Sequence, residues 1–207
     1  MATATHIPLS EYLETSYRPD REYVDGELRE RNVGKWDHAR VQAVLTAWFF
    51  NHEAEWNIMV GPEPRMLIPK SATRTDVRIP DVVVVVAGDH PPTLTEPTLL
   101  VIEVLSPEDS YSDTQERARD YQQMGVEMVW IVDPKTLTGR MCSGAQWVES
   151  RRLEVPGTPL FVDLDEIFRQ IRPNRSGSLR RHNRKTKSPT ASERTHSCWT
   201  NVLEKLH

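Results

Sequence analysis

The ten residues TLLVIEVLSP, Thr98 to Pro107, are the stretch of sequence that most constrains the fold. Leu, Val and Ile side chains fill its interior, as is typical of a β-strand buried in a sheet. Glu103 stands at the centre of this apolar run. An ionised carboxylate in such surroundings is costly unless a partner compensates its charge. The strand therefore predicts a cation close to Glu103.

The composition indicates one acidic domain followed by a basic segment. Residues 172–207 contain nine of the 26 Lys and Arg but only two of the 30 Asp and Glu, which leaves residues 1–171 with a net charge of −11. An acidic body repels nucleic acid at long range, so activity on DNA or RNA would need divalent cations or a local basic patch. We expect residues 1–171 to form one domain. Residues 172–207, poor in apolar side chains, are expected to be a disordered basic tail rather than a dedicated nucleic-acid arm.

No leader peptide or membrane-spanning segment is recognisable, because the longest apolar run, Val82 to Ala87, is far too short to cross a bilayer. Cys142 and Cys198 lie far apart, which predicts neither a disulfide framework nor a zinc–thiolate site. We therefore expect a cytoplasmic protein with no membrane association. Walker, GxGxxG, HExxH and GxSxG motifs do not occur in the sequence, which argues against nucleotide hydrolases, Rossmann redox enzymes, zincins and serine esterases.

The first half of the chain predicts a hairpin, a long helix and strands. Asp25-Gly26 stands between the alternating arms of REYVDGELRE, which is typical of a two-residue β-hairpin. From Trp36 onward, apolar residues recur at i, i+3, i+4, i+7 and i+8, which predicts an amphipathic helix ending within residues 51–54. Residues 57–68 and 81–87 predict strands, separated by a polar loop over 69–78.

The second half of the chain predicts further helices and strands. Ser112 and Gln115 form an S-x-x-Q capping box and Gly125 supplies a stop, so a helix is expected over residues 113–124. The strand EMVWIVDP follows it immediately. This order of elements predicts an α/β layer fold. The remaining expected elements are a short helix over residues 10–17, short strands at 140–141 and 145–148, and a short helix over 163–168.

A second acid stands near the start of the strand that precedes Glu103. Pro80-Asp81 leads into Val82–Ala87, and if the two strands are neighbours, facing carboxylates would have Cβ atoms about 4.5–5.5 Å apart. Carboxylates that close repel each other unless a cation lies between them. Oxygen ligands in a partly open site suit magnesium, which takes one or two carboxylates and binds substrate phosphate. The alternatives are a turn or strand cap for Asp81 and a structural ion pair for Glu103.

Six motifs follow one another along the chain: EYVDGELRE, the helix with His38, IPDVVVV, LLVIEVLSP, DTQERARDYQQMGV and VWIVDP. Each motif is weak evidence alone, but all six in this order are specific for one family. Over roughly residues 8–170 the chain thereby resembles the Uma-type restriction endonucleases, a group within the PD-(D/E)xK nuclease superfamily. The resemblance implies a restriction-endonuclease-like fold, with a mixed central β-sheet flanked by helices. It also implies magnesium-dependent hydrolysis of phosphodiester bonds, with DNA as the substrate and manganese as a possible substitute. Asp81 matches the Asp of the PD motif, and Glu103 matches the next acid.

The sequence departs from the family pattern at the basic residue. The simplest form of the motif has a lysine two residues after the acid, where this chain has Leu105. In the Uma-type group a lysine follows an Asp by about one turn of the next helix, and the matching residues here are Asp113 and Arg117. Arginine cannot act as a base but can hold a phosphate oxygen or stabilise negative charge. Water activation would then depend on the metal. The alternative is a surface ion pair of Arg117 with Asp113.

Two N-terminal residues are further candidates. Glu22 occupies the position of a frequent family acid and could bind metal or water, against the alternative of a solvent-exposed strand charge. His38 is on the apolar stripe of its helix and should face the sheet, either as a phosphate or metal contact or as a buried, hydrogen-bonded histidine. Tyr121 shares a helix face with Arg117, and its ring is expected to pack under the helix.

The leading hypothesis is a metal-dependent endonuclease in which Asp81 and Glu103 hold magnesium and Arg117 stabilises the charge on phosphorus. A homodimer is expected, because nucleases of this size commonly act on two strands as symmetric dimers. The alternative is a catalytically degenerate nuclease fold that binds nucleic acid or protein without cutting. Leu105 and Arg117, together with the acidic body, favour that alternative.

Overall fold

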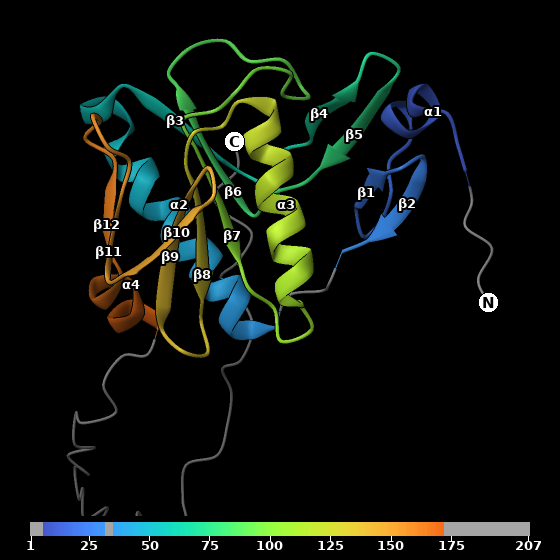
Figure 1. The fold of residues 1–207 in the computed structure, drawn as a ribbon. Helices are drawn as coiled ribbons and strands as arrows, with labels where there is room; N and C mark the ends of the chain where they lie inside the picture. Colours follow the sequence, from blue (N-terminus) through green and yellow to red (C-terminus); the bar gives the residue numbers. More distant parts are fainter. Residues whose placement is uncertain (1–5, 32–34, 172–207) are drawn as a thin grey trace, which may run out of the picture. The chain divides into compact units, whose positions relative to one another are not determined.

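The computed structural model describes residues 6–31 and 35–171, and the fold is drawn in Figure 1. The predicted basic tail lies outside the described residues, and the domain boundary at residue 171 stays a prediction. The helices are α1 (Leu9–Glu14), α2 (Trp36–Trp56), α3 (Tyr111–Met124) and α4 (Leu164–Ile171), and the strands are β1 (Arg21–Val24), β2 (Glu27–Glu30), β3 (Ile58–Pro62), β4 (Met66–Ser71), β5 (Arg74–Arg78), β6 (Val82–Val86), β7 (Leu100–Val104), β8 (Val129–Asp133), β9 (Thr138–Ser143), β10 (Gln146–Ser150), β11 (Arg152–Glu154) and β12 (Phe161–Asp163).

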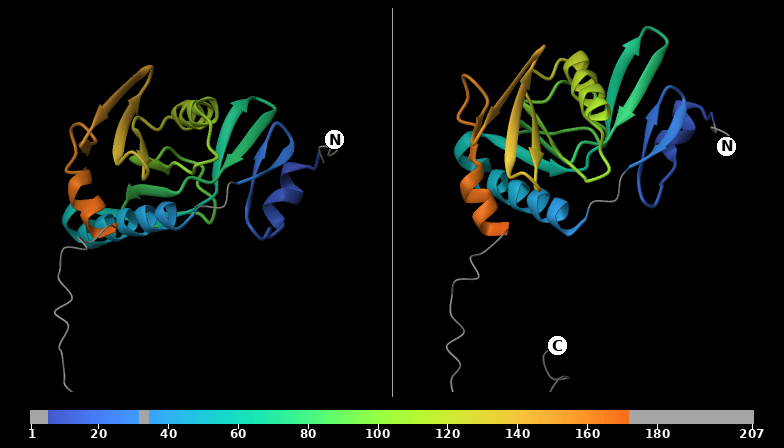
Figure 2. Two further views of the ribbon diagram at one scale, coloured as in Figure 1. Left: turned by 90° about the horizontal axis from the view of Figure 1, so that it is seen from below. Right: turned by 60° about the horizontal axis from the view of Figure 1, so that its bottom comes forward.

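A six-stranded mixed sheet forms the centre of the fold, in the order β10-β9-β8-β7-β6-β3. β7 pairs antiparallel with β6 and parallel with β8. A parallel pair needs a crossover connection, and α3 supplies it between β7 and β8. Helices α2 and α4 pack on one face of the sheet and α3 on the other (Figure 2). The predicted mixed central sheet with flanking helices is therefore confirmed.

Apolar side chains alternate between the two faces of the central strands. Leu100 and Ile102 of β7 join the core under α2, whereas Val101 joins the core under α3. This alternation places Glu103, next in line after Ile102, on the α3 side of the strand. A second sheet, in the order β2-β1-β5-β4, continues from the α3 side, where Met66 and Ile68 of β4 join the same core.

Local sequence signals predict some element ends correctly and miss others. Asp25 and Gly26 both have positive φ, 57° and 82°, as the predicted two-residue hairpin requires. Gly125 ends α3 with φ 105°. The predicted capping box is wrong, because Ser110 is the N-cap and its side chain accepts a hydrogen bond from the Asp113 amide. α2 runs to Trp56, slightly beyond its expected end.

The polar loop predicted over residues 69–78 is wrong, because this segment forms the turn and most of the strands of the β4–β5 hairpin. Two of its four charged residues are buried and compensated: Asp76 is fully buried and binds Arg74, whose side chain is 44% exposed, and Arg78 binds acids from β1 and α3. The short pair β11–β12 was also not predicted.

Prolines lie on two strands at the edges of the sheets. β3 is an edge of the six-stranded sheet and ends at Pro62, and β4 is an edge of the four-stranded sheet and contains Pro69. Proline has no backbone N–H and is tolerated mainly in such positions. Among the described helices, none combines the length and apolar character that a transmembrane segment requires.

Candidate active site

The antiparallel register of β6 and β7 brings the two predicted acids together. Val82 pairs with Ile102 and Val83 with Val101, so the next step of the register sets Asp81 opposite Glu103. Both carboxylates are buried, each residue being 3% exposed. The sequence analysis supposed that these strands are neighbours, and the structure shows that they are.

Asp81 is held by three donors. Its Oδ2 accepts a hydrogen bond from the Val104 amide at 2.7 Å, and lies 3.2 Å from Nε2 of His38. Its Oδ1 pairs with Nη2 of Arg31 at 3.1 Å. Burial by itself lowers the pKa of His38, but the hydrogen bond to Asp81 and the charge of Asp81 outweigh it and raise that pKa above its ordinary value. His38 is thus a buried, hydrogen-bonded histidine that faces the site.

Glu103 is held by two side chains of α3. Its Oε1 accepts a hydrogen bond of 2.5 Å from the hydroxyl of Tyr121, and its Oε2 lies 3.3 Å from Nη1 of Arg117. Burial raises the pKa of Glu103 to about 7; Arg117 opposes the rise and the charge of Asp81 adds to it. The cation that the strand sequence predicts is therefore Arg117.

For Arg117 the alternative of a surface ion pair is wrong, and Tyr121 makes one contact beyond its expected packing. Arg117 pairs with Glu103 rather than with Asp113. Asp113 is exposed in the first turn of α3, where its amide donates to Ser110. The structure therefore does not bring Asp113 to the acids. Tyr121 packs under α3 as expected, but its hydroxyl reaches Glu103, which the helical pattern could not show.

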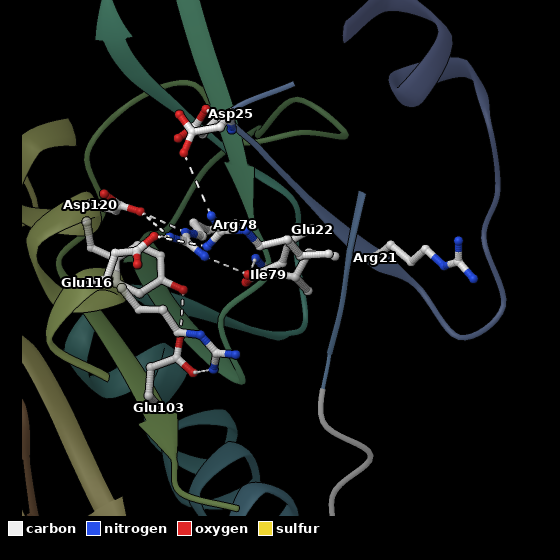
Figure 3. Close-up of polar contacts among 12 residues, drawn as sticks. Arg21, Glu22, Asp25, Arg78, Ile79, Glu103, Glu116 and Asp120 are labelled. Atoms are coloured by element: carbon white, nitrogen blue, oxygen red, sulfur yellow. Dashed lines mark hydrogen bonds and ion pairs between the residues drawn. The ribbon is translucent and has the colours of Figure 1, made fainter. Parts of the chain in front are cut away.

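Glu22 lies in a buried ion-pair network beside the site, shown in Figure 3. Its Oε2 accepts from Nη1 of Arg78 at 2.8 Å, and its Oε1 accepts from the Ile79 amide at 3.2 Å. Arg78 also binds Glu116 and Asp120 of α3. The alternative of a solvent-exposed strand charge for Glu22 is wrong, because Arg78 compensates its charge in the interior.

A small pocket opens beside Asp81, Arg31 and Arg117, with a volume of about 10 Å³, close to the smallest space that holds one water. A larger pocket of about 340 Å³ shares His38, Ser106 and Asp109 with it and is also lined by Lys35 and Lys135. The site is therefore adjacent to a wider opening. Arg31, His38, Asp81, Val104, Ser106, Asp109 and Arg117 line the small pocket.

The family described as "Uma2: Putative restriction endonuclease" matches residues 9–171. The chain belongs to the Uma2 family. Its fold is similar to the crystal structure of "a putative nuclease belonging to DUF820" from Anabaena variabilis, with a TM-score of 0.69 and 18% sequence identity over 80% of this chain and 99% of that chain. No curated protein matches the chain. Uma2 membership supports a nuclease and confirms the resemblance drawn from the motifs.

The donor chemistry of the site fits a hard divalent cation. Magnesium commonly takes only one or two protein carboxylates and completes its shell with water and phosphate, and Asp81 and Glu103 offer two such carboxylates from facing strands. Within residues 6–31 and 35–171, no three His, Cys, Asp or Glu side chains converge as a closed metal site. Each of the four carboxylate oxygens already faces a protein donor, so a cation would have to displace some of these contacts.

Proposed function

We propose that this chain is a divalent-metal-dependent endonuclease that hydrolyses phosphodiester bonds in DNA. Asp81 and Glu103 hold the metal, magnesium with manganese as a substitute, and Arg117 stabilises negative charge on the phosphate. Uma2 membership supports nuclease activity. The observation that carries the finer proposal is the β6–β7 register, which sets two buried acids opposite each other beside an arginine.

The electrostatics of the acids support a site for a cation. The charge of Asp81 helps to raise the pKa of Glu103, so the two carboxylates sense each other in a buried environment. A divalent ion bound there supplies Lewis acidity and lowers the pKa of water close to it. The residues of the chain provide the orientation: the hydroxyl of Tyr121 fixes one oxygen of Glu103, and the Val104 amide fixes one oxygen of Asp81.

Arg117 provides a permanent positive charge. Burial alone lowers the pKa of Arg117, but the surrounding negative charges, of which Glu103 is the largest, together outweigh burial and raise that pKa above its ordinary value. The guanidinium therefore neither takes nor gives a proton during the reaction. It lines the small pocket together with Asp81, where it can bind a phosphate oxygen and stabilise the charge that develops in the transition state.

Cleavage of supercoiled plasmid and of single-stranded oligonucleotides tests the proposal, with Mg²⁺, Mn²⁺ or EDTA present. Wild type should nick DNA only with metal, and Asp81→Asn and Glu103→Gln should each lose this activity. Glu149→Gln is the control, since this acid lies on β10, away from the acids, with its side chain 56% exposed. Absence of metal-dependent cleavage by wild type, or full activity in Glu103→Gln, would overturn the proposal.

A degenerate nuclease fold that binds without cutting is the second candidate. The observation that favours it is the protein donor at every carboxylate oxygen, together with Leu105 and Arg117 at the two lysine positions. Calorimetric titration with Mg²⁺ separates the two functions. A nuclease should bind the ion in a manner that Asp81→Asn abolishes, whereas a degenerate fold should show no such binding.

We further propose a cytoplasmic homodimer, in which two copies would present one site to each strand of a duplex. The acidic body makes metal ions and local cations important for contact with DNA. Sedimentation equilibrium of the full chain should give twice the mass of the 23.8 kDa chain, and a monomer at all concentrations would contradict the homodimer.

A further inference from the structure

Arg31 is a cation of the site that no sequence motif singles out. It follows β2 directly, and its side chain is 16% exposed. One arm of the guanidinium pairs with Oδ1 of Asp81 at 3.1 Å, and the other pairs with Oε1 of Glu63 at 3.2 Å. Arg31 thus spans from a buried acid to an acid whose side chain is 52% exposed.

The three donors on Asp81 differ in how easily they can leave. The Val104 amide belongs to the backbone of β7, and His38 is buried on α2, so both are fixed by the fold. The guanidinium of Arg31, by contrast, stands at the flexible end of a long side chain. Its second partner, Glu63, is a half-exposed acid that holds the guanidinium only weakly. Oδ1 of Asp81 is therefore the oxygen most readily released to another cation.

The charged side chains that line the small pocket nearly balance before a divalent cation binds. Asp81 and Asp109 line it with Arg31, Arg117 and His38. Two additional positive charges at Asp81 would repel the guanidinium of Arg31 and leave the pocket with surplus positive charge. A guanidinium that loses its carboxylate in such a place has a natural new partner in a phosphate, which it can bind through two parallel hydrogen bonds.

We infer that Arg31 is a phosphate-binding residue that exchanges anions: it neutralises Asp81 in the metal-free protein and moves to the backbone phosphate of a bound DNA strand when a divalent cation takes its place at Asp81. The inference rests on the proposed function, because it assumes that Asp81 holds metal and that the substrate is a nucleic acid. It makes Arg31 a competitor of the metal and a partner of the substrate. Removing Arg31 should therefore shift the two affinities in opposite directions.

Arg31→Gln tests this prediction in the full chain. Mn²⁺ binding, followed by electron paramagnetic resonance without DNA, should become about tenfold tighter, which is about 1.4 kcal/mol, because a competing cation is gone. Binding of a short fluorescein-labelled duplex in Ca²⁺, followed by anisotropy, should weaken severalfold, and the slope of log affinity against log salt should fall by about 0.9 for one lost phosphate contact. A purely structural role would not give these opposite signs.

Two further variants complete the test. Arg21→Gln makes the same change of charge on β1, where the arginine pairs with exposed Glu30, and it should move neither affinity. Arg31→Lys keeps the charge without the planar fork, so Mn²⁺ affinity should stay within about twofold of wild type while DNA affinity falls. If thermal unfolding shows that Arg31→Gln does not fold, Arg31→Lys tests the inference alone: unchanged Mn²⁺ affinity with weaker DNA binding supports it, and unchanged DNA binding overturns it.

The outcomes separate this inference from the proposed function. Wild type that binds Mn²⁺ and DNA without cutting would contradict the nuclease but leave the exchange by Arg31 intact. Unchanged or weaker Mn²⁺ binding in Arg31→Gln would overturn the inference whatever the cleavage assay shows. The same holds if neither wild type nor Arg31→Gln binds Mn²⁺, or if the duplex binds Arg31→Gln as tightly as wild type.

Discussion

Replacing Glu103 with glutamine should stabilise the protein at alkaline pH while it abolishes cleavage. Glu103 is 3% exposed, and burial raises its pKa from 4.5 to about 7 despite the attraction of Arg117. Its folded-state pKa therefore lies above its unfolded-state pKa, so the folded protein binds the extra proton between these values. Stability should then fall as pH rises through this interval, and the full cost should be present above pH 7.

The size of this cost follows from the two pKa values. A difference of one in pKa corresponds to about 1.4 kcal/mol, so the rise from 4.5 to about 7 corresponds to about 3 kcal/mol in the free energy of unfolding. Glutamine imitates the protonated acid and can still accept from Tyr121 or Arg117. Glu103→Gln should therefore unfold with about 3 kcal/mol more free energy than wild type at pH 8.5, but with only about 1 kcal/mol more at pH 5.

Urea unfolding, followed by tryptophan fluorescence in EDTA at the two pH values, measures this difference. In thermal unfolding it should appear as about 6–12 °C at pH 8.5, since 1 kcal/mol shifts the midpoint of a protein of this size by about 2–4 °C. Glu149→Gln should show no such pH dependence. The reasoning is refuted if Glu103→Gln is no more stable than wild type at pH 8.5, or if the difference is the same at both pH values.

Three further predictions concern residues outside the acids. Arg78→Met should lower the free energy of unfolding by about 3–5 kcal/mol in urea titrations, because it leaves buried acids without a partner. Arg29→Met, at a half-exposed pair, should cost less than about 1 kcal/mol. Equal losses in the two variants would contradict the burial argument. Gly139→Ala should cost about 1–3 kcal/mol by thermal unfolding, because its Cβ would lie 2.6 Å from Leu164 Cδ1 and 2.9 Å from Leu153 Cδ1, and an unchanged midpoint would show that these side chains yield. Burial raises the pKa of the Cys142 thiol to about 12, so in a Cys198→Ser background a thiol reagent at pH 8 should react only after denaturant is added, and rapid reaction of the native protein would refute its burial.

The parts of the fold that the sequence predicts are those set by short-range signals. The positive-φ pair Asp25-Gly26 fixes its hairpin, and the apolar spacing of Val41, Leu45 and Phe49 fixes the buried face of α2. β5 escaped prediction because its interior positions carry charges, which in isolation indicate a loop. The acids that compensate Arg78, such as Glu22 and Asp120, lie 56 and 42 residues away, where no local pattern reveals them.

The same division applies to the candidate site. Asp81 and Glu103 are recognisable because each is an acid attached to an apolar strand, and the register of β6 and β7 then sets them opposite each other. The side chains that bind these two acids were harder to predict from the sequence, because their positions depend on how α3 and the segment after β2 pack against these strands. Tyr121 has a helical position that suits core packing, and its hydrogen bond appears only in three dimensions. Arg31 has no sequence signal of its own.

The edge prolines have a consequence for how this protein behaves at high concentration. An open row of unpaired amides and carbonyls invites a strand from another molecule, the first step toward amyloid-like stacking. Pro62 and Pro69 interrupt that row on β3 and β4, and Glu30 and Glu149 place charge on the opposite outer strands of the same two sheets, β2 and β10. The edge strands of these two sheets therefore oppose strand pairing between molecules, and the protein should stay unaggregated at high concentration.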